Sequence, residues 1–126
     1  MQPVNLFELA TQQARWLSVR QSAVSNNVAN ANTPGYAAVD VEPFEALLDK
    51  HRVSMQATHP LHVSTGSTPD KITYRQVEQS TPLMPSGNTV TLETELMKAG
   101  EIRRGMEMNT AIVSSFHRML TLVTRG

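Results

Sequence analysis

Apolar residues recur at alternating steps of three and four near both ends of the chain, and this pattern constrains the fold more than any other feature. In each segment eight positions fall on one helical face and seven are apolar, which is typical of a coiled coil. The N-terminal seam comprises Phe7, Ala10, Ala14, Leu17, Gln21, Val24, Val28 and Ala31. The C-terminal seam comprises Ala99, Ile102, Met106, Asn109, Val113, Phe116, Leu120 and Val123. Each seam spans 24 residue steps (7 to 31 and 99 to 123), roughly 36 Å of helix. We therefore predict that the two helices pair.

Each seam has one polar exception, Gln21 in the first and Asn109 in the second. A single buried amide in a heptad seam fixes register and partner number at some cost in stability. The alternative is that both amides lie at a wet interface. We favour the first interpretation because each exception lies in the interior of its seam.

The N-terminal helix is predicted to stop abruptly within Asn26–Tyr36. Pro34 disfavours the α conformation of Thr33, so the helix ends at or before Thr33. Proline followed by Gly35 predicts a type II turn in which the glycine adopts a positive φ. Four asparagines precede this stop, and asparagine is a poor helix former with a high hydrogen-bonding capacity. We expect their side chains to bond to the turn or to a neighbouring subunit.

The C-terminal helix has its own start signal. Thr91 is the expected N-cap, and Glu93 and Glu95 follow in the first turn, where they favour the helix dipole. Gly100 and Gly105 each weaken this helix by about 1 kcal/mol relative to alanine. Alternatively, they permit close approach of another backbone.

Residues 37–88 are polar and hold five of the seven prolines. Alternation over Val39–Glu42 and over Ile72–Val77 predicts two short strands. Phe44–Leu48 is predicted to form one or two helical turns, and Gln79–Asn88 to form a linker.

The predicted fold is mainly α, with long N- and C-terminal helices paired as an antiparallel coiled coil and an irregular, β-containing middle segment. The chain divides into residues 1–33 as the N-terminal helix, residues 34–88 as the irregular outer segment with strands and linker, and residues 89–126 as the C-terminal helix. A lone two-helix hairpin buries too little apolar surface to offset the entropy of ordering it. We expect full helical order only in an assembly.

Composition excludes several classes of function. Lysine plus arginine and aspartate plus glutamate both number 11, and no basic run is present, so nothing favours nucleic acid. The absence of cysteine removes disulfides and thiol chemistry. No apolar run reaches the length of a transmembrane helix. Met1–Leu9 lacks the basic residues of a cleaved signal peptide.

No catalytic, cofactor-binding or metal site is predicted. His59 and His62 are separated by Pro60, which makes a helical metal pair improbable, and no third ligand follows. His117 adjoins two serines but no oxyanion loop accompanies it. The carboxylates of Asp40, Glu42 and Glu45 are interpreted as a solvated surface. The C-terminal methionines favour core or seam packing, with a flexible binding surface as the alternative. These methionines are Met97, Met106, Met108 and Met119.

Residues 18–41 resemble the N-terminal signature of bacterial flagellar rod and hook proteins, in which an Asn-x-Ala-Asn-x-x-Thr-Pro-Gly-Tyr motif ends the first helix. The matching residues are Asn27, Ala29, Asn30, Thr33, Pro34, Gly35 and Tyr36. The short length, Phe44–Leu48, Thr58–His62, Met108–Val113 and Phe116–Leu120 resemble the proximal rod members in particular. The sibling FlgC type shares the N-terminal motif. The resemblance implies that the motif forms a helix-end turn and an interface.

The resemblance also implies a structural, non-enzymatic protein of the bacterial flagellum basal body. Such proteins are exported by the flagellar type III apparatus without a cleaved signal and stack helically in the periplasm to form the rod, the drive shaft of the motor. The implied partners are other copies of the chain, rod proteins of the FlgC and FlgF type, the rod-base adaptor FliE, the MS ring and the export gate. Neither nucleic acid nor a membrane-spanning segment is implied.

A second interpretation keeps the paired helices without the polymer: a soluble helical adaptor or export chaperone. An enzyme is a third interpretation, with less support because no complete catalytic constellation is present. Helical assembly and location separate the first interpretation from the second.

Overall fold

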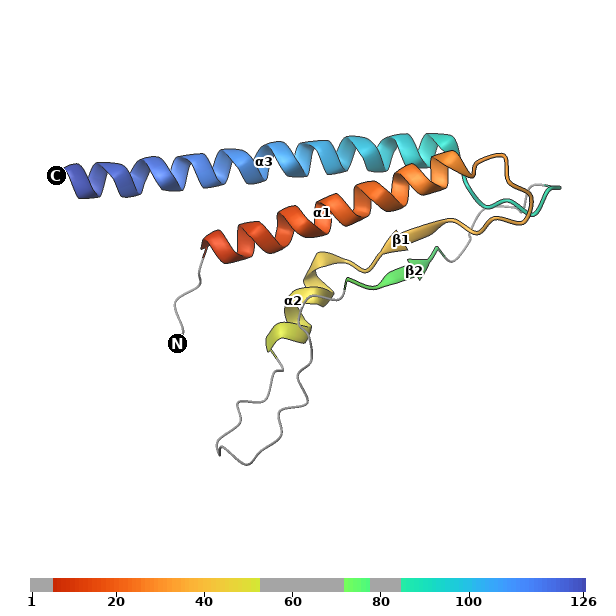
Figure 1. Cartoon of the computed structure of the whole chain (residues 1–126), viewed down its shortest axis with the longest axis horizontal. Coiled ribbons are helices and arrows are strands. Elements are labelled where there is room, and N and C mark those ends of the chain that lie inside the picture. The colour runs from red at the N-terminus through yellow and green to blue at the C-terminus, as the bar shows by residue number, and fades with distance from the viewer. Residues whose placement is uncertain (1–5, 53–71, 78–84) are drawn as a thin grey trace, which may run out of the picture.

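Two long antiparallel helices form the frame of the molecule, as predicted, and a small middle segment lies along one of them (Figure 1). The computed structural model describes residues 6–52, 72–77 and 85–126. The elements in chain order are α1 (Leu6–Ala29), β1 (Val39–Val41), α2 (Phe44–Arg52), β2 (Tyr74–Gln76) and α3 (Leu92–Arg125). Both termini of the helix pair lie toward the same end of the molecule, and the connections lie toward the other.

The core between α1 and α3 is narrow. Leu17, Val24 and Ile102 are only 2–6% exposed, and Trp16 and Met106 pack against them. The buried residues Ala10, Leu17 and Val24 recur every seven residues along α1, so they line one helical face. The pairing of α1 with α3 thus rests on a few large apolar side chains rather than on a continuous apolar layer.

Gly105 lets the two helices approach closely. A Cβ at this position would lie 3.1 Å from Cδ2 of Leu17, which is tighter than nine in ten real contacts. The structure thus shows close approach at Gly105 by a side chain rather than by another backbone. At Gly100 the described residues provide no close neighbour, because a Cβ there would meet nothing within 4 Å.

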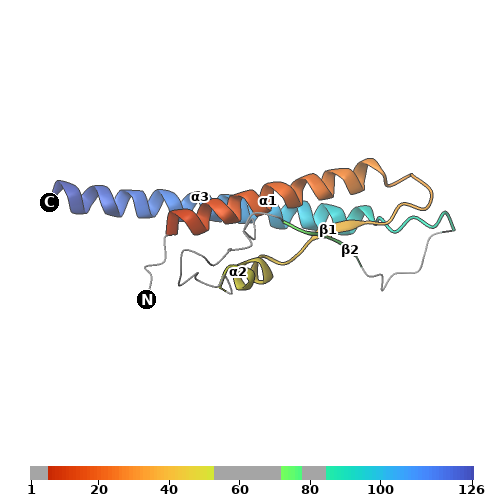
Figure 2. The same ribbon diagram turned by 60° about the horizontal axis from the view of Figure 1, so that its bottom comes forward.

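The middle segment docks on α1 through β1, and the predicted strands and helical turns are confirmed. β1 and β2 form an antiparallel ladder with Asp40 opposite Arg75. Trp16 of α1 donates its indole N–H to the carbonyl oxygen of Glu42 at 2.8 Å. Its ring lies 5.8 Å from the ring of Phe44 at the start of α2. Figure 2 shows β1, β2 and α2 gathered along one side of the helix pair.

The two helices differ in length, and α3 extends past the N-terminal end of α1 (Figure 1). α1 has 24 residues and α3 has 34. Near the start of α1 the rings of Phe7 and Phe116 meet edge to face, with centroids 5.2 Å apart. The α3 residues after Phe116 form an overhang. Among the described residues, no helix is long and apolar enough to cross a membrane.

Candidate functional site at the helix junction

The chain reverses direction between α1 and β1 through the predicted turn. α1 ends at Ala29, and the Tyr36 amide donates to the carbonyl oxygen of Thr33 at 3.3 Å, closing a four-residue turn around Pro34 and Gly35. Gly35 has φ +72°, the left-handed conformation that glycine adopts without steric cost. The helix stop and the positive φ are thus confirmed.

The turn also contacts the chain segment that leads into α3. The Gly35 amide donates to the carbonyl oxygen of Ser86 at 2.9 Å, and the Thr89 amide donates to that of Tyr36 at 3.0 Å. The Ala38 amide donates to Oγ1 of Thr89 at 2.6 Å. The turn therefore holds the start of the C-terminal segment as well as the end of α1.

Asn27 is the most buried side chain of the junction, with 0% exposure. Its Nδ2 donates to the carbonyl oxygen of Val39 at 2.7 Å and to Oε2 of Glu95 at 3.1 Å. Its Oδ1 accepts from the Val39 amide at 3.0 Å and from the Tyr36 hydroxyl at 3.4 Å. One asparagine therefore ties α1 to β1, to α3 and to the turn, using both ends of its amide.

Asn88, in the segment that leads into α3, makes a second set of side-chain hydrogen bonds at the junction. Sequence reasoning missed this role. Its Nδ2 lies 2.8, 2.9 and 2.8 Å from the carbonyl oxygens of Asn30, Ala31 and Thr33. Its Oδ1 accepts from the Val90 amide at 2.8 Å. These carbonyls belong to the turn that follows α1, which ends at Ala29, so Asn88 holds this turn from a distant part of the sequence. The signal that would have found Asn88 is its 2% exposure, and exposure is known only from the fold.

The remaining motif residues lie around the rim of the junction. Asn30 donates from Nδ2 to the carbonyl oxygen of Asn26 at 2.8 Å, and its Oδ1 accepts from the Thr33 hydroxyl at 3.2 Å. Ala29 and Pro34 are exposed, as are the side chains of Asn26 and Asn32. Two of the four asparagines before the stop thus bond within the chain.

A charged network joins the same three elements next to Asn27. Nε of Arg20 lies 3.2 Å from Oδ1 of Asp40, and Nζ of Lys98 lies 3.3 Å from Oδ2 of Asp40 and 3.1 Å from Oε1 of Glu95. Arg20 also reaches Oε2 of Glu101 at 3.4 Å. The guanidinium carbon of Arg20 lies 5.5 Å from the Trp16 ring centroid, within cation–π range.

Burial of Asp40 acts to raise the pKa of its carboxyl group. The hydrogen bonds from Arg20 and from the Val41 amide, with the positive charges of Arg20 and Lys98, outweigh that effect and hold the pKa below the ordinary 3.8. The interpretation of this carboxylate as part of a solvated surface is therefore wrong. Alternation in β1 places Asp40 toward the helices, whereas Glu45 is exposed.

The structure buries some of the predicted seam residues and leaves others exposed. Ala10, Leu17, Val24 and Ile102 are buried, and five more are partly buried: Ala31, Met106, Asn109, Val113 and Phe116. Seven are exposed: Phe7, Ala14, Gln21, Val28, Ala99, Leu120 and Val123. On α1 the buried face also includes Ala23 and Asn27, because β1 covers that side of the helix.

The two polar seam positions have different surroundings. Nδ2 of Asn109 donates to the carbonyl oxygen of Ala10 at 2.9 Å and to Oε1 of Gln13 at 3.1 Å. These bonds cross from α3 to α1 and favour a single register of the pair. Gln21 is exposed and lies off the α3 contact.

The candidate metal and catalytic residues do not form a site in the part of the chain that the structure describes. No group of three or more histidine, cysteine, aspartate or glutamate side chains there could hold a metal ion. His117 and the nearby Ser114 and Ser115 are exposed on α3. His59 and His62 lie outside the described residues. Met97, Met108 and Met119 are 55–69% exposed, so only Met106 packs in the core as expected.

Comparison with known proteins agrees with this geometry. Residues 9–36, which cover most of α1 and the turn, match the family described as "Flagella basal body rod protein". The chain is 44% identical to the flagellar basal body rod protein FlgB of Agrobacterium fabrum over 129 aligned residues, 99% of this chain and 96% of the relative. The chain therefore belongs to the flagellar basal body rod protein family, as an FlgB-like structural subunit of the rod.

Proposed function

We propose that the chain is a subunit of the proximal rod, exported by the flagellar type III apparatus and assembled helically in the periplasm as part of the motor drive shaft. The observation that carries the proposal is the similarity to FlgB over nearly the whole chain. The proposed role is structural, without catalysis, cofactor or metal.

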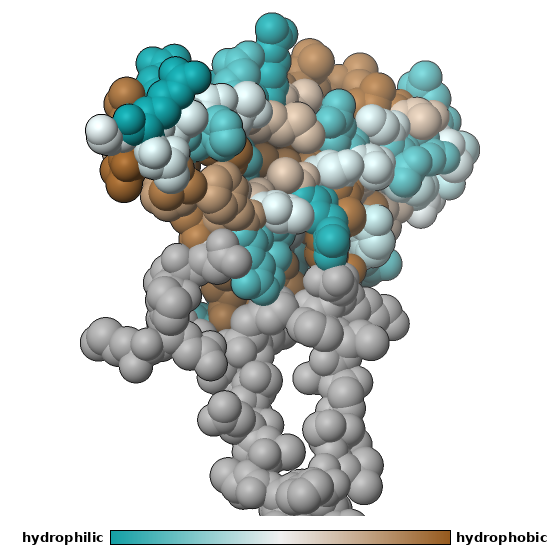
Figure 3. Space-filling model, turned by 60° about the vertical axis from the view of Figure 1, so that its left-hand side comes forward, coloured by the Kyte–Doolittle hydropathy of each residue, from teal (hydrophilic) through white to brown (hydrophobic). Residues whose placement is uncertain are grey.

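The surface of α3 supports assembly as the purpose of the fold. Large apolar side chains are exposed along its whole length, from Leu92 at 49% to Val123 at 79%. Large apolar side chains exposed in such number mark a surface that binds another protein. Figure 3 shows apolar side chains, in brown, reaching the surface of the helix pair between polar ones.

Within such a rod the three chain segments take different places. Residues 1–33 and 89–126 form the inner coiled-coil layer, and residues 34–88 form the outer part. The proposed partners are other copies of the chain, FlgC-type and FlgF-type rod proteins, FliE, the MS ring and the export gate. The motif residues 27–36 fix the junction at which the chain leaves the inner layer.

The proposal is tested in a strain that lacks the chain's own gene and carries a tagged copy. The chain should copurify with basal bodies and restore motility. It should remain in the cytoplasm when the flagellar export apparatus is inactivated. A chain found only in the soluble fraction, with rods formed normally in its absence, would instead support the adaptor or export chaperone.

A further inference from the structure

α3 carries a line of large apolar side chains that α1 does not cover. We define the methionine strip as Met97, Met108, Ile112, Met119 and Leu122. Each is between 44% and 69% exposed. At 3.6 residues per turn the strip lies about 120° around the helix from Ile102 and Asn109, which face α1. Its three methionines are spaced by eleven residues, close to three helical turns. The charged and exposed Glu101 and Arg104 lie on the same line, so the strip is free of charge only from Met108 to Leu122.

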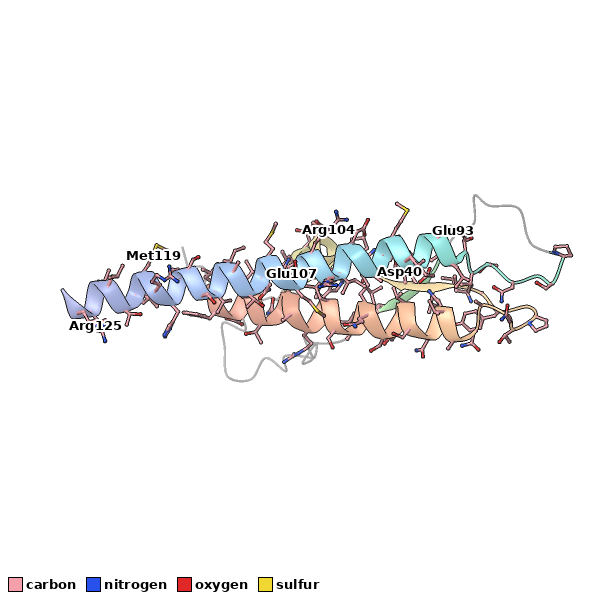
Figure 4. The ribbon with its side chains drawn as sticks, turned by 90° about the horizontal axis from the view of Figure 1, so that it is seen from above. Asp40, Glu93, Arg104, Glu107, Met119 and Arg125 are labelled. Atoms are coloured by element: carbon pink, nitrogen blue, oxygen red, sulfur yellow. The ribbon has the colours of Figure 1, made fainter. Side chains whose placement is uncertain are left out.

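A second side of α3, about 120° from the strip, is polar from Arg103 to Arg118, whereas Leu92 and Leu96 make the same side apolar near the start of the helix. We define the polar strip as Arg103, Glu107, Thr110, Ser114 and Arg118, all exposed. Nε of Arg103 lies 3.2 Å from Oε1 of Glu107. Figure 4 shows Met119 and Arg125 projecting from opposite edges of α3. The helix therefore has one face for α1, one suited to water and one suited to another apolar surface.

The chain itself carries an exposed, uncharged surface of mostly small side chains on α1. We define the α1 outer face as Ala14, Ser18, Gln21, Ser25 and Val28, which are exposed and follow the spacing of a helical seam. None of these side chains is charged, and four are no larger than valine. Small side chains let a second helix approach closely, and methionine is flexible enough to fill the shallow gaps that remain.

We propose that, in the rod, the methionine strip of one copy of this chain packs against the α1 outer face of the next copy. The absence of charge along the α1 outer face favours this occupant, because burying a methionine strip against charged side chains would leave those charges without water. The proposal rests on the proposed rod function and names the surfaces by which copies meet.

The proposed contact is heterologous: each copy uses its methionine strip with one neighbour and its α1 outer face with another. A heterologous contact generates a ring or an open helical array, whereas a two-fold dimer uses the same surface twice. A repeating array is the arrangement that a rod requires.

The test uses the absence of cysteine from the chain. In isolated basal bodies, the double variant Met108→Cys with Ser18→Cys is treated with a short bis-maleimide. We expect a ladder of covalent multimers of the chain. The matched control, Ser114→Cys with Ser18→Cys, replaces the strip cysteine by one on the polar strip and should give no ladder. Both α3 positions are exposed, so neither change should disturb the helix pair.

A second measurement uses a mono-maleimide on the single variants. Close packing excludes the reagent, so Met108→Cys should react on the order of tenfold more slowly than Ser114→Cys in basal bodies. Equal rates would show an open strip and overturn the proposal. Crosslinking of Met108→Cys to a different protein would overturn the second copy as occupant. Absence of the chain from basal bodies would refute the rod function itself, an outcome distinct from both.

Discussion

The two ends of the helix pair are built on different principles. At the junction, Asn27 and Asn88 are 0% and 2% exposed and make directional hydrogen bonds to α1, β1 and the turn. In the described residues no buried side-chain nitrogen or oxygen lacks a partner. At the far end the Phe7–Phe116 contact is followed by the α3 overhang, on which Leu120 and Val123 are 43% and 79% exposed.

This difference separates what a single copy completes from what an assembly completes. Hydrogen bonds are directional, and leaving a buried group unpaired is costly, so the junction specifies one geometry within the chain. Apolar contact is non-directional and grows with the area removed from water. The far end therefore gains stability from any neighbour that covers it. We expect the junction to order first and the overhang to order with its partners.

The largest expected effect comes from the core that joins the two ends. Leu17→Asp places an unpaired charge at a position with 3% exposure and should cost about 4 kcal/mol or more. Urea unfolding followed by circular dichroism measures the loss, and motility should disappear. Ser22→Asp, on the exposed side of α1, is the control. Normal rods in the Leu17 variant would contradict the assigned core. Val113→Asp, at a partly buried position, should have a smaller effect in the same direction.

A junction variant tests whether that end is complete in one copy. Asn27→Ala leaves the Val39 backbone groups and Glu95 without their partner and should lower the free energy of unfolding by about 3 kcal/mol. The loss should not depend on protein concentration. Asn26→Ala changes an exposed side chain of the same type and should have little effect. A loss seen only in assembled rods would mean that Asn27 stabilises a contact between subunits instead.

The turn permits a sharper test of backbone conformation alone. A Cβ at Gly35 would meet nothing within 4 Å, so we expect Gly35→Val to act chiefly through the positive φ of this position. The expected cost is about 1–2 kcal/mol, measured by urea unfolding. Gly35→Asn should recover much of it, because asparagine tolerates the left-handed region. Equal stability of the valine variant would mean that the turn contributes nothing to the junction.

The charged network predicts a dependence on pH. The pKa of Asp40 is lower in the folded chain than its ordinary 3.8. Its contribution to stability is therefore fully present above 3.8 and is lost as the pH falls through the folded value. Asp40→Asn should flatten the acid limb of a plot of urea midpoint against pH. Glu45→Gln, at an exposed carboxylate, should leave that limb unchanged.

The smallest effect on folding is expected in the α3 overhang. Leu120→Ser changes a side chain that is already 43% exposed and should alter the free energy of unfolding of the single copy by less than about 0.5 kcal/mol. The same variant should reduce the amount of chain recovered in basal bodies. Thr121→Ser is the neighbouring control. A large loss of single-copy stability would remove the distinction between the two ends.

The sequence alone was sufficient for the local architecture. Apolar periodicity predicted both helices, Pro34 and Gly35 predicted the stop and the positive φ, and alternation predicted β1. Each of these features depends on residues within a few positions of one another, where steric and hydrogen-bonding preferences act directly. The family followed from the same stretch, because residues 9–36 contain the helix and its stop.

Only the tertiary structure shows which faces of each helix are buried against other elements. α1 has two neighbours, α3 and β1, so its buried face moves toward Asn27 and away from Gln21. A heptad pattern cannot show this, because it marks one apolar stripe and carries no information on which other side of the helix a strand will cover. The contacts of Asn27 with Glu95 and of Asn88 with Thr33 join residues 68 and 55 positions apart. Their partners are set by the path of the chain in space, and no local preference encodes it.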